Sequence, residues 1–129
     1  MKLIRALFYF EGIALNSGVG AFCLIFPAAF VANFVPTGLP GLALEFIRWY
    51  GVLLMVLGYF ELRALRSGNV QALVFAIEAL LFGDVLHLVA SGLFLQAGVT
   101  FSIAVGFMFF MTTLLALTRT YWLYRTARQ

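Results

Sequence analysis

Apolar residues fill four long stretches of the chain, and short polar or glycine-rich links separate them. A helix that crosses the hydrocarbon core of a bilayer needs about 20 mostly apolar residues, and each stretch is long enough. The predicted spans are residues 4–26, 42–65, 70–95 and 99–117. The pattern predicts an all-α fold, an integral membrane four-helix bundle that forms a single transmembrane domain over residues 1–129.

The links determine how the spans follow one another. Residues 27–41 are apolar but hold all three prolines of the chain, so they cannot form a continuous helix, and we expect an interfacial loop. The turn Arg66-Ser67-Gly68-Asn69 and the link Gln96-Ala97-Gly98 are short. Short links favour antiparallel neighbours, which predicts an up-down topology.

Basic residues predict the orientation. The ends and links of the chain carry 2, 0, 2, 0 and 3 Lys or Arg in order, so seven of the eight basic residues fall on one side. They are Lys2, Arg5, Arg63, Arg66, Arg119, Arg125 and Arg128. By the positive-inside rule both termini are cytoplasmic, in a multi-pass protein of a plasma membrane or a cell inner membrane. Contact with anionic lipids accounts for the pI of about 9.4 without nucleic acid as a partner.

A cleaved signal peptide is the alternative interpretation of the N-terminus. Lys2 and Arg5 would be its basic region, and Val19-Gly20-Ala21 its cleavage site. Glu11 interrupts the apolar core that such a peptide needs, and the apolar run continues to Phe26. We therefore expect an uncleaved first helix.

Composition excludes a soluble domain. Hydrophobic residues make up 64% of the chain and charged residues 10%, against roughly 25% charged in soluble proteins, and the mean hydropathy is +1.07. The single cysteine, Cys23, allows no disulfide within the chain. The sequence contains no Cys/His metal motif and no glycine-rich phosphate loop, so we predict no metal site, and the sequence identifies no cofactor.

Arg48 is the one basic residue that the orientation rule does not explain. It lies about 10 Å into the second span from the outer side, where a cation needs a partner and should face protein or water. Glu45 is one turn earlier on the same face, and Asp84 and His87 are candidates across the bundle. The predicted outer polar layer holds Glu45, Arg48, Asp84, His87 and Ser91.

A second, inner layer is predicted from three acids. It holds Glu11, Glu61 and Glu78, with Asn16 between the layers. Arg63 or Arg119 would neutralise some of these carboxylates.

Each layer has two interpretations. One is a structural network that fixes the helices in register. The other is a ligand-binding or proton-handling cavity, with Asp84, His87 and Glu78 as candidate catalytic residues and Arg48, Glu45, Ser91, Asn16, Glu11 and Glu61 as candidate ligand-binding residues.

Short motifs give a resemblance to known families. The second span, with Arg48-Trp49-Tyr50-Gly51 and then Gly58, resembles small four-helix membrane proteins of the DoxX-like group, and Pro27 after the first span agrees with this. The segment Gly83-Asp84-Val85-Leu86-His87 is similar to four-span scaffold proteins of sterol biosynthesis in the endoplasmic reticulum. The first resemblance implies a minor subunit of a membrane complex, and neither assigns a catalytic residue.

Three function classes follow. The first is a non-enzymatic membrane protein that binds a hydrophobic small molecule or serves as a subunit or scaffold, with the lipid bilayer and a homo-oligomer or larger complex as partners. The second is a membrane-embedded isomerase or cyclase that acts by acid-base chemistry on a lipid-like or isoprenoid substrate. The third is an oligomeric proton-coupled transporter or channel. The sequence does not decide whether the protein is an enzyme.

Overall fold

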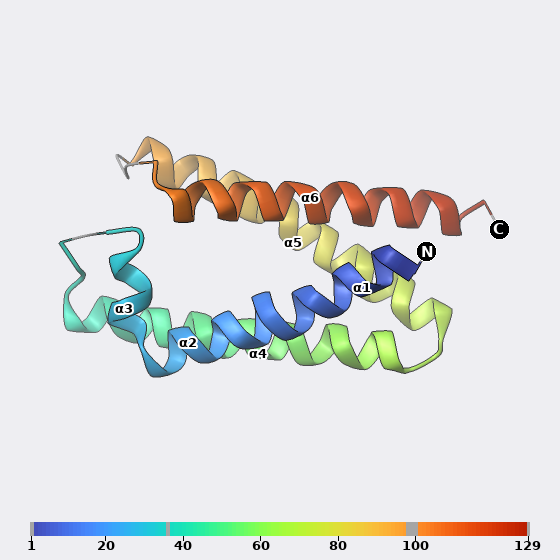
Figure 1. Ribbon diagram of the computed structural model, residues 1–129, viewed down its shortest axis with the longest axis horizontal. Coiled ribbons are helices and arrows are strands. Elements are labelled where there is room, and N and C mark those ends of the chain that lie inside the picture. Colours follow the sequence, from blue (N-terminus) through green and yellow to red (C-terminus); the bar gives the residue numbers. More distant parts are fainter. Residues whose placement is uncertain (1, 36, 98–100, 129) are drawn as a thin grey trace. The chain divides into compact units, whose positions relative to one another are not determined.

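The computed structural model describes residues 2–35, 37–97 and 101–128, and all regular elements within those ranges are helices. Four helical stretches are long and apolar enough to cross a membrane, which confirms the predicted class. They are Ile4–Ile25, Gly41–Arg66, Val70–Gln96 and Ile103–Thr126. The helices pack into two compact units, Met1–Gly68 and Asn69–Gln129 (Figure 1).

The first span is a continuous helical path with an internal change of winding. Its parts are α1 (Lys2–Phe10), the π-helix η1 (Glu11–Gly18) and α2 (Val19–Ile25). The path ends because Pro27 disfavours helical geometry in the residue before it, and Phe26 adopts φ −126° and ψ 56°. The π-helix is unusual in its length, since π-helical winding normally occurs as a single turn within an α-helix.

The connection to the second span contains a short helix, α3 (Pro27–Ala32). Asn33 ends it by donating from Nδ2 to the carbonyl oxygens of Ala29 and Phe30, at 2.9 and 3.2 Å. Residues 27–35 and 37–40 thus contain this short helix and no helix that continues into the second span. Pro36 lies outside the described residues, and the location of this segment at the membrane interface stays a prediction.

Helix α4 (Gly41–Arg66) packs against η1 and α2 so closely that their backbones touch. A methyl group added to Gly51 would lie 2.6 Å from the carbonyl oxygen of Gly20, and one added to Gly58 would lie 2.8 Å from that of Gly12. Small residues permit such close approach, which drives helix association in lipid. The partner numbers fall in α4 as they rise in the first span, so the two helices run in opposite directions (Figure 1).

Arg5, near the start of the first span, contacts Leu65, near the end of α4. Its guanidinium donates to the carbonyl oxygen of Leu65 at 2.6 Å. Leu65 lies in the last turn of α4, where carbonyls lack an intrahelical donor and a cation interacts favourably with the helix dipole. This contact places Lys2 and Arg5 at the same end of the unit as Arg63 and Arg66.

The Arg5→Ala variant should therefore lose about 1 kcal/mol of unfolding free energy, because a carbonyl in the last turn of α4 loses its charged donor. Lys2→Ala is the matched control, since it removes one positive charge from the same helix, and it should change stability by less than about 0.5 kcal/mol. Unfolding in mild detergent by added dodecyl sulfate, followed by circular dichroism, measures both. Equal losses in the two variants would show that only net charge matters at this end.

The second unit is a pair of helices, α5 (Val70–Gln96) and α6 (Ile103–Thr126). Asn69 caps α5 by accepting from the backbone N–H groups of Gln71 and Ala72, and Ser102 caps α6 by accepting from that of Val105. The predicted link residue Gly98 and the predicted start at Val99 lie outside the described residues.

Helix α6 continues nine residues beyond Leu117, where the sequence analysis ended the span. Polar residues after Leu117 do not end the helix because their hydroxyls bond back to the preceding turn. Thr118 donates to Leu114 O at 2.7 Å and Thr120 donates to Ala116 O at 2.8 Å. The extension moves Arg119 into the helix, seven residues before its end.

Buried residues recur at seven-residue spacing on both helices of the second unit. On α5 they include Ile77, Asp84 and Ser91, and on α6 they include Val105, Thr112 and Arg119. Leu80 lies three positions after Ile77 on α5, and Leu115 and Trp122 lie three positions after Thr112 and Arg119 on α6. This spacing is the seam of a coiled-coil-like helix pair. Ile77, Leu80, Asp84 and Ser91 therefore share one buried face of α5.

Candidate functional site

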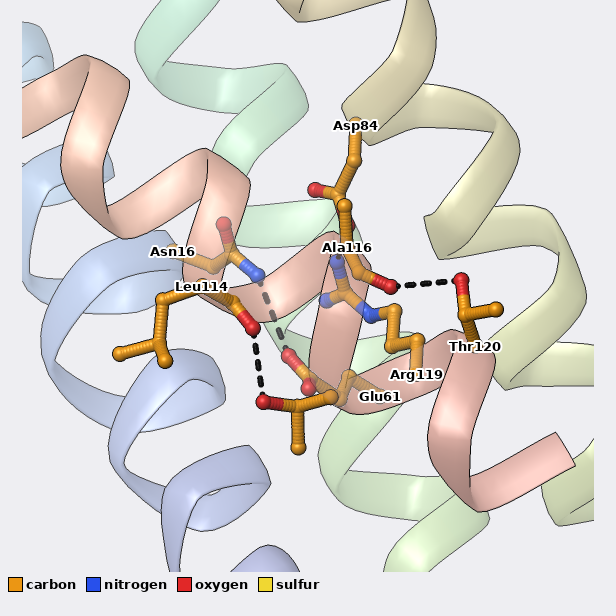
Figure 2. Close-up of polar contacts among 8 residues, drawn as sticks. Asn16, Glu61, Asp84, Leu114, Ala116, Arg119 and Thr120 are labelled. Carbon is orange, nitrogen blue, oxygen red and sulfur yellow. Dashed lines mark hydrogen bonds and ion pairs between the residues drawn. The ribbon is translucent and has the colours of Figure 1, made fainter. Parts of the chain in front are cut away.

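Two polar pairs lie in helix seams, one in each unit. In the second unit Asp84 of α5 pairs with Arg119 of α6, and in the first unit Asn16 of η1 pairs with Glu61 of α4 (Figure 2). All four side chains are buried. The sequence predicts Asn16, Glu61 and Asp84 inside the spans, and the structure buries all three.

The Asp84–Arg119 pair joins opposite charges at the centre of the α5–α6 seam. Arg119 Nη1 donates to Asp84 Oδ2, and Arg119 has no exposed surface. Side chains on a helix point toward its N-terminus, so the long Arg119 side chain extends back along α6 to the level of Asp84 (Figure 2). A buried charge without a partner is very costly in a medium of low polarity, so each residue of the pair makes the other tolerable.

The Asn16–Glu61 pair is built on the π-helix. Asn16 Nδ2 donates to Glu61 Oε2 at 3.1 Å, and only 1% of Glu61 is exposed. Gly12 makes room for this carboxylate, because a Cβ at Gly12 would lie 3.2 Å from Glu61 Oε2. Ser17 donates to Gly12 O at 2.7 Å and so satisfies a carbonyl five residues earlier in η1. Glu11, at the start of η1, is also buried.

The pair of Arg48 and Glu45 differs from the other two because it lies on the surface of α4. The residues are one turn apart, Arg48 Nη1 contacts Glu45 Oε1, and the side chains are 42% and 53% exposed. The predicted partner Glu45 is thus in place.

The remaining predicted residues are more exposed. His87 lies on α5 three residues after Asp84 and is half-buried, and Glu78 is exposed. The convergence of Arg48 on Asp84 and His87, and that of Glu78 on Glu11 and Glu61, would each join residues of different units, and both stay predictions. The same holds for the catalytic roles of Asp84, His87 and Glu78.

The sequence places Arg119 among the basic residues outside the fourth span, whereas the structure places it in α6, completely buried and paired with Asp84. Two signals were available. Asp84 needed a cation at mid-membrane, and the aromatic residues Tyr121, Trp122 and Tyr124, which favour the membrane interface, follow Arg119.

Metal binding finds no support in the geometry of residues 2–35, 37–97 and 101–128, where no three His, Cys, Asp or Glu side chains come together to hold an ion. The two buried pairs are best suited to holding neighbouring helices together.

Comparisons with known proteins assign no role to these residues. No protein family, curated protein or solved structure matches this chain.

Proposed function

We propose that this chain is a four-span, antiparallel membrane protein with both termini in the cytoplasm, and that it acts without catalysis as a binding subunit of a membrane complex. Its binding surface is a stripe of large apolar side chains on α4. The occupant of that stripe is a helix of a partner protein or a hydrophobic small molecule. The polar pairs inside the spans hold each helix hairpin together and take no part in a reaction.

One observation carries the proposal: two buried polar pairs, Asn16–Glu61 and Asp84–Arg119, form inside the hairpins, while large apolar side chains remain exposed in a regular row. The row, called the α4 stripe below, follows alternating spacings of four and three residues, which is the spacing of a helix-packing seam. It consists of Leu42, Phe46, Trp49, Leu53, Val56 and Phe60, which are 38–75% exposed. The opposite face carries Gly51 and Gly58 and is occupied by the first span.

The resemblance to the DoxX-like group supports the subunit interpretation only in part. Gly51 and Gly58, which carry the resemblance, are the residues at which α4 touches the first span. Close packing therefore accounts for both glycines without a shared function. We keep membership of that group as a proposal.

Photocrosslinking tests the binding surface at single positions. Benzoylphenylalanine is placed at Phe46 or Trp49 of the α4 stripe, and at Phe82 of α5 as a control, which is 66% exposed. Irradiation in native membranes should give one discrete protein or small-molecule adduct from the stripe and only lipid adducts from the control. Lipid adducts alone at all three positions would contradict the proposal.

The orientation is tested separately with reporters fused to the two termini. In the first unit, basic residues gather at the end where Arg5 contacts Leu65. In the second unit, Arg125 and Arg128 lie near the C-terminus. Even without the buried Arg119, two basic residues remain at the C-terminal end of the fourth span, Arg125 in its last turn and Arg128 beyond it, so the charge asymmetry persists. We expect green fluorescent protein at either terminus to fluoresce and alkaline phosphatase to be inactive. Phosphatase activity at either end would contradict this topology.

A proton-coupled transporter is the second candidate, and the π-helix favours it. Rare π-helical segments concentrate at functional sites, and η1 carries buried Glu11 and Asn16 beside Glu61. If the chain transports, protein reconstituted in vesicles should dissipate a pH gradient. Glu61→Gln should abolish this, whereas exposed Glu78→Gln should not. A gradient that decays as in empty vesicles would remove this candidate.

A further inference from the structure

The C-terminal end of α6 and the turn that follows it present four exposed residues on one face, two tyrosines followed by two arginines. Tyr121, Tyr124, Arg125 and Arg128 fall within about 100° of one another around the helix axis. All four are exposed, whereas Arg119 and Trp122 on the other side of the helix are buried. We call these four residues the α6 basic face.

The two arginines of this face are held in place by the two tyrosines. The guanidinium carbon of Arg128 lies 4.1 Å from the ring centroid of Tyr124, and that of Arg125 lies 6.0 Å from the ring centroid of Tyr121. An arginine over an aromatic ring is attracted to its face and keeps its edge N–H groups available. Those N–H groups form a planar fork that matches the oxygens of a phosphate.

The face is also free of competing carboxylates from its own helix. No aspartate or glutamate follows Asp84 in the sequence, so α6 supplies no acid to neutralise Arg125 or Arg128. Arg48 is different, since Glu45 lies one turn away and contacts it. The face therefore carries a local positive charge that an external anion can balance.

Helix length puts the face at the height of lipid headgroups. The 24 residues of α6 extend about 36 Å at 1.5 Å per residue, which exceeds the roughly 30 Å hydrocarbon core by about four residues. The tyrosines then lie at the boundary and the arginines just beyond it, as aromatic and basic residues do in other membrane proteins. Leu117, 65% exposed on the same side one turn before Tyr121, offers an apolar surface for an acyl chain.

We propose that the α6 basic face is a binding site for the phosphate of an anionic phospholipid. Arg125 and Arg128 bind the phosphate oxygens, the tyrosines hold the guanidinium groups in position, and Leu117 contacts the upper part of an acyl chain. This site is independent of the α4 stripe and of what binds there. It would fix α6 at one leaflet and distinguish anionic from neutral lipids.

Tryptophan quenching by brominated lipids tests the proposal. The chain has two tryptophans, so the Trp49→Phe variant leaves as the probe Trp122, which lies at the same height along α6 as the face but on the buried side of the helix. This variant is reconstituted in phosphatidylcholine vesicles that contain either brominated phosphatidylglycerol or brominated phosphatidylcholine. At about 1 kcal/mol per arginine near a charged surface, each arginine should give about a fivefold preference for the anionic lipid, and both together up to about 30-fold.

Paired variants decide between a site and diffuse surface charge. R125Q/R128Q in the same background should bring the preference close to one, whereas R63Q/R66Q, which removes two charges at the end of α4, should leave most of it. The emission maximum of Trp122 checks that each variant is folded, and the single variants R125Q and R128Q replace the double one if it is not. Equal quenching by both lipids in the parent, or equal losses in the two double variants, would overturn the proposal.

Discussion

The Gly51→Ala variant is expected to lose about 3 kcal/mol of unfolding free energy or to fail to assemble its first unit. A Cβ at Gly51 would lie 2.6 Å from Gly20 O and 2.9 Å from both Cys23 Cβ and Leu24 N. Two of these three atoms belong to the backbone, and the third is a Cβ fixed to it, so none can move aside as a flexible side chain would. Overpacking in such a place costs about 1–3 kcal/mol and occasionally more.

Gly83→Ala is the matched control for this prediction. Gly83 also lies within a spanning helix, but a Cβ there would meet no described atom within 4 Å. The substitution should be neutral or slightly stabilising, because alanine favours a helix over glycine. Dodecyl sulfate titration of the purified protein in mild detergent, followed by circular dichroism, measures both variants. Equal stabilities for Gly51→Ala and Gly83→Ala would show that α4 and α2 do not pack backbone to backbone.

Breaking the Asp84–Arg119 pair is expected to have an effect of similar size. Arg119→Gln leaves a buried carboxylate without its cation, and Asp84→Asn leaves a buried guanidinium without its anion. Removal of one partner from a buried ion pair typically costs about 3–5 kcal/mol. Arg63→Gln and Glu78→Gln, which neutralise exposed residues, should change stability by less than about 0.5 kcal/mol. The same titration, followed by the fluorescence of Trp122 in a Trp49→Phe background, measures the unfolding of α6.

If both single variants lose less than about 1 kcal/mol of unfolding free energy, the pair does not hold α5 and α6 together. In that case Asp84 could serve a ligand or a proton. The acid-base enzyme interpretation would then gain weight over the subunit interpretation.

The sequence predicted the four spans because their signal is strong and local. Twenty or more apolar residues between breaks can hardly have another role in a chain of this composition, and Pro27 ends the first span close to where the structure ends it. The helix of the last span continues beyond Leu117 to Thr126. Its apolar run ends at Leu117, but threonine hydroxyls bonded to the preceding turn, and an arginine paired with an acid of α5, allow the helix to continue.

Five of the nine candidate site residues are buried, and that they form a functional site stays a prediction. Burial of Asp84 and Ser91 follows from helical periodicity, and burial of Glu11, Asn16 and Glu61 follows from the cost of a polar group in lipid. The partner of Asp84 could not be read from periodicity, because it depends on which helix packs against α5 and in which register.

The π-helix η1 illustrates the same limit in the first unit. Its residues alone do not specify i+5 winding, which changes the direction in which Asn16 points. That winding accompanies the tight contact of Gly12 with α4 and the hydrogen bond from Ser17 to Gly12 O. A tertiary contact of this kind leaves no periodic pattern in the sequence.

The central claim is that the buried polar pairs fasten helices to one another, and the double variant Asp84→Asn/Arg119→Gln tests it most directly. If the pair is a fastener, loss of both charges removes the uncompensated charge that each single variant leaves behind. The unfolding free energy of the double variant should then return to within about 1–2 kcal/mol of the native value. A double variant that loses the sum of the two single losses would show that Asp84 and Arg119 act independently and would contradict the claim.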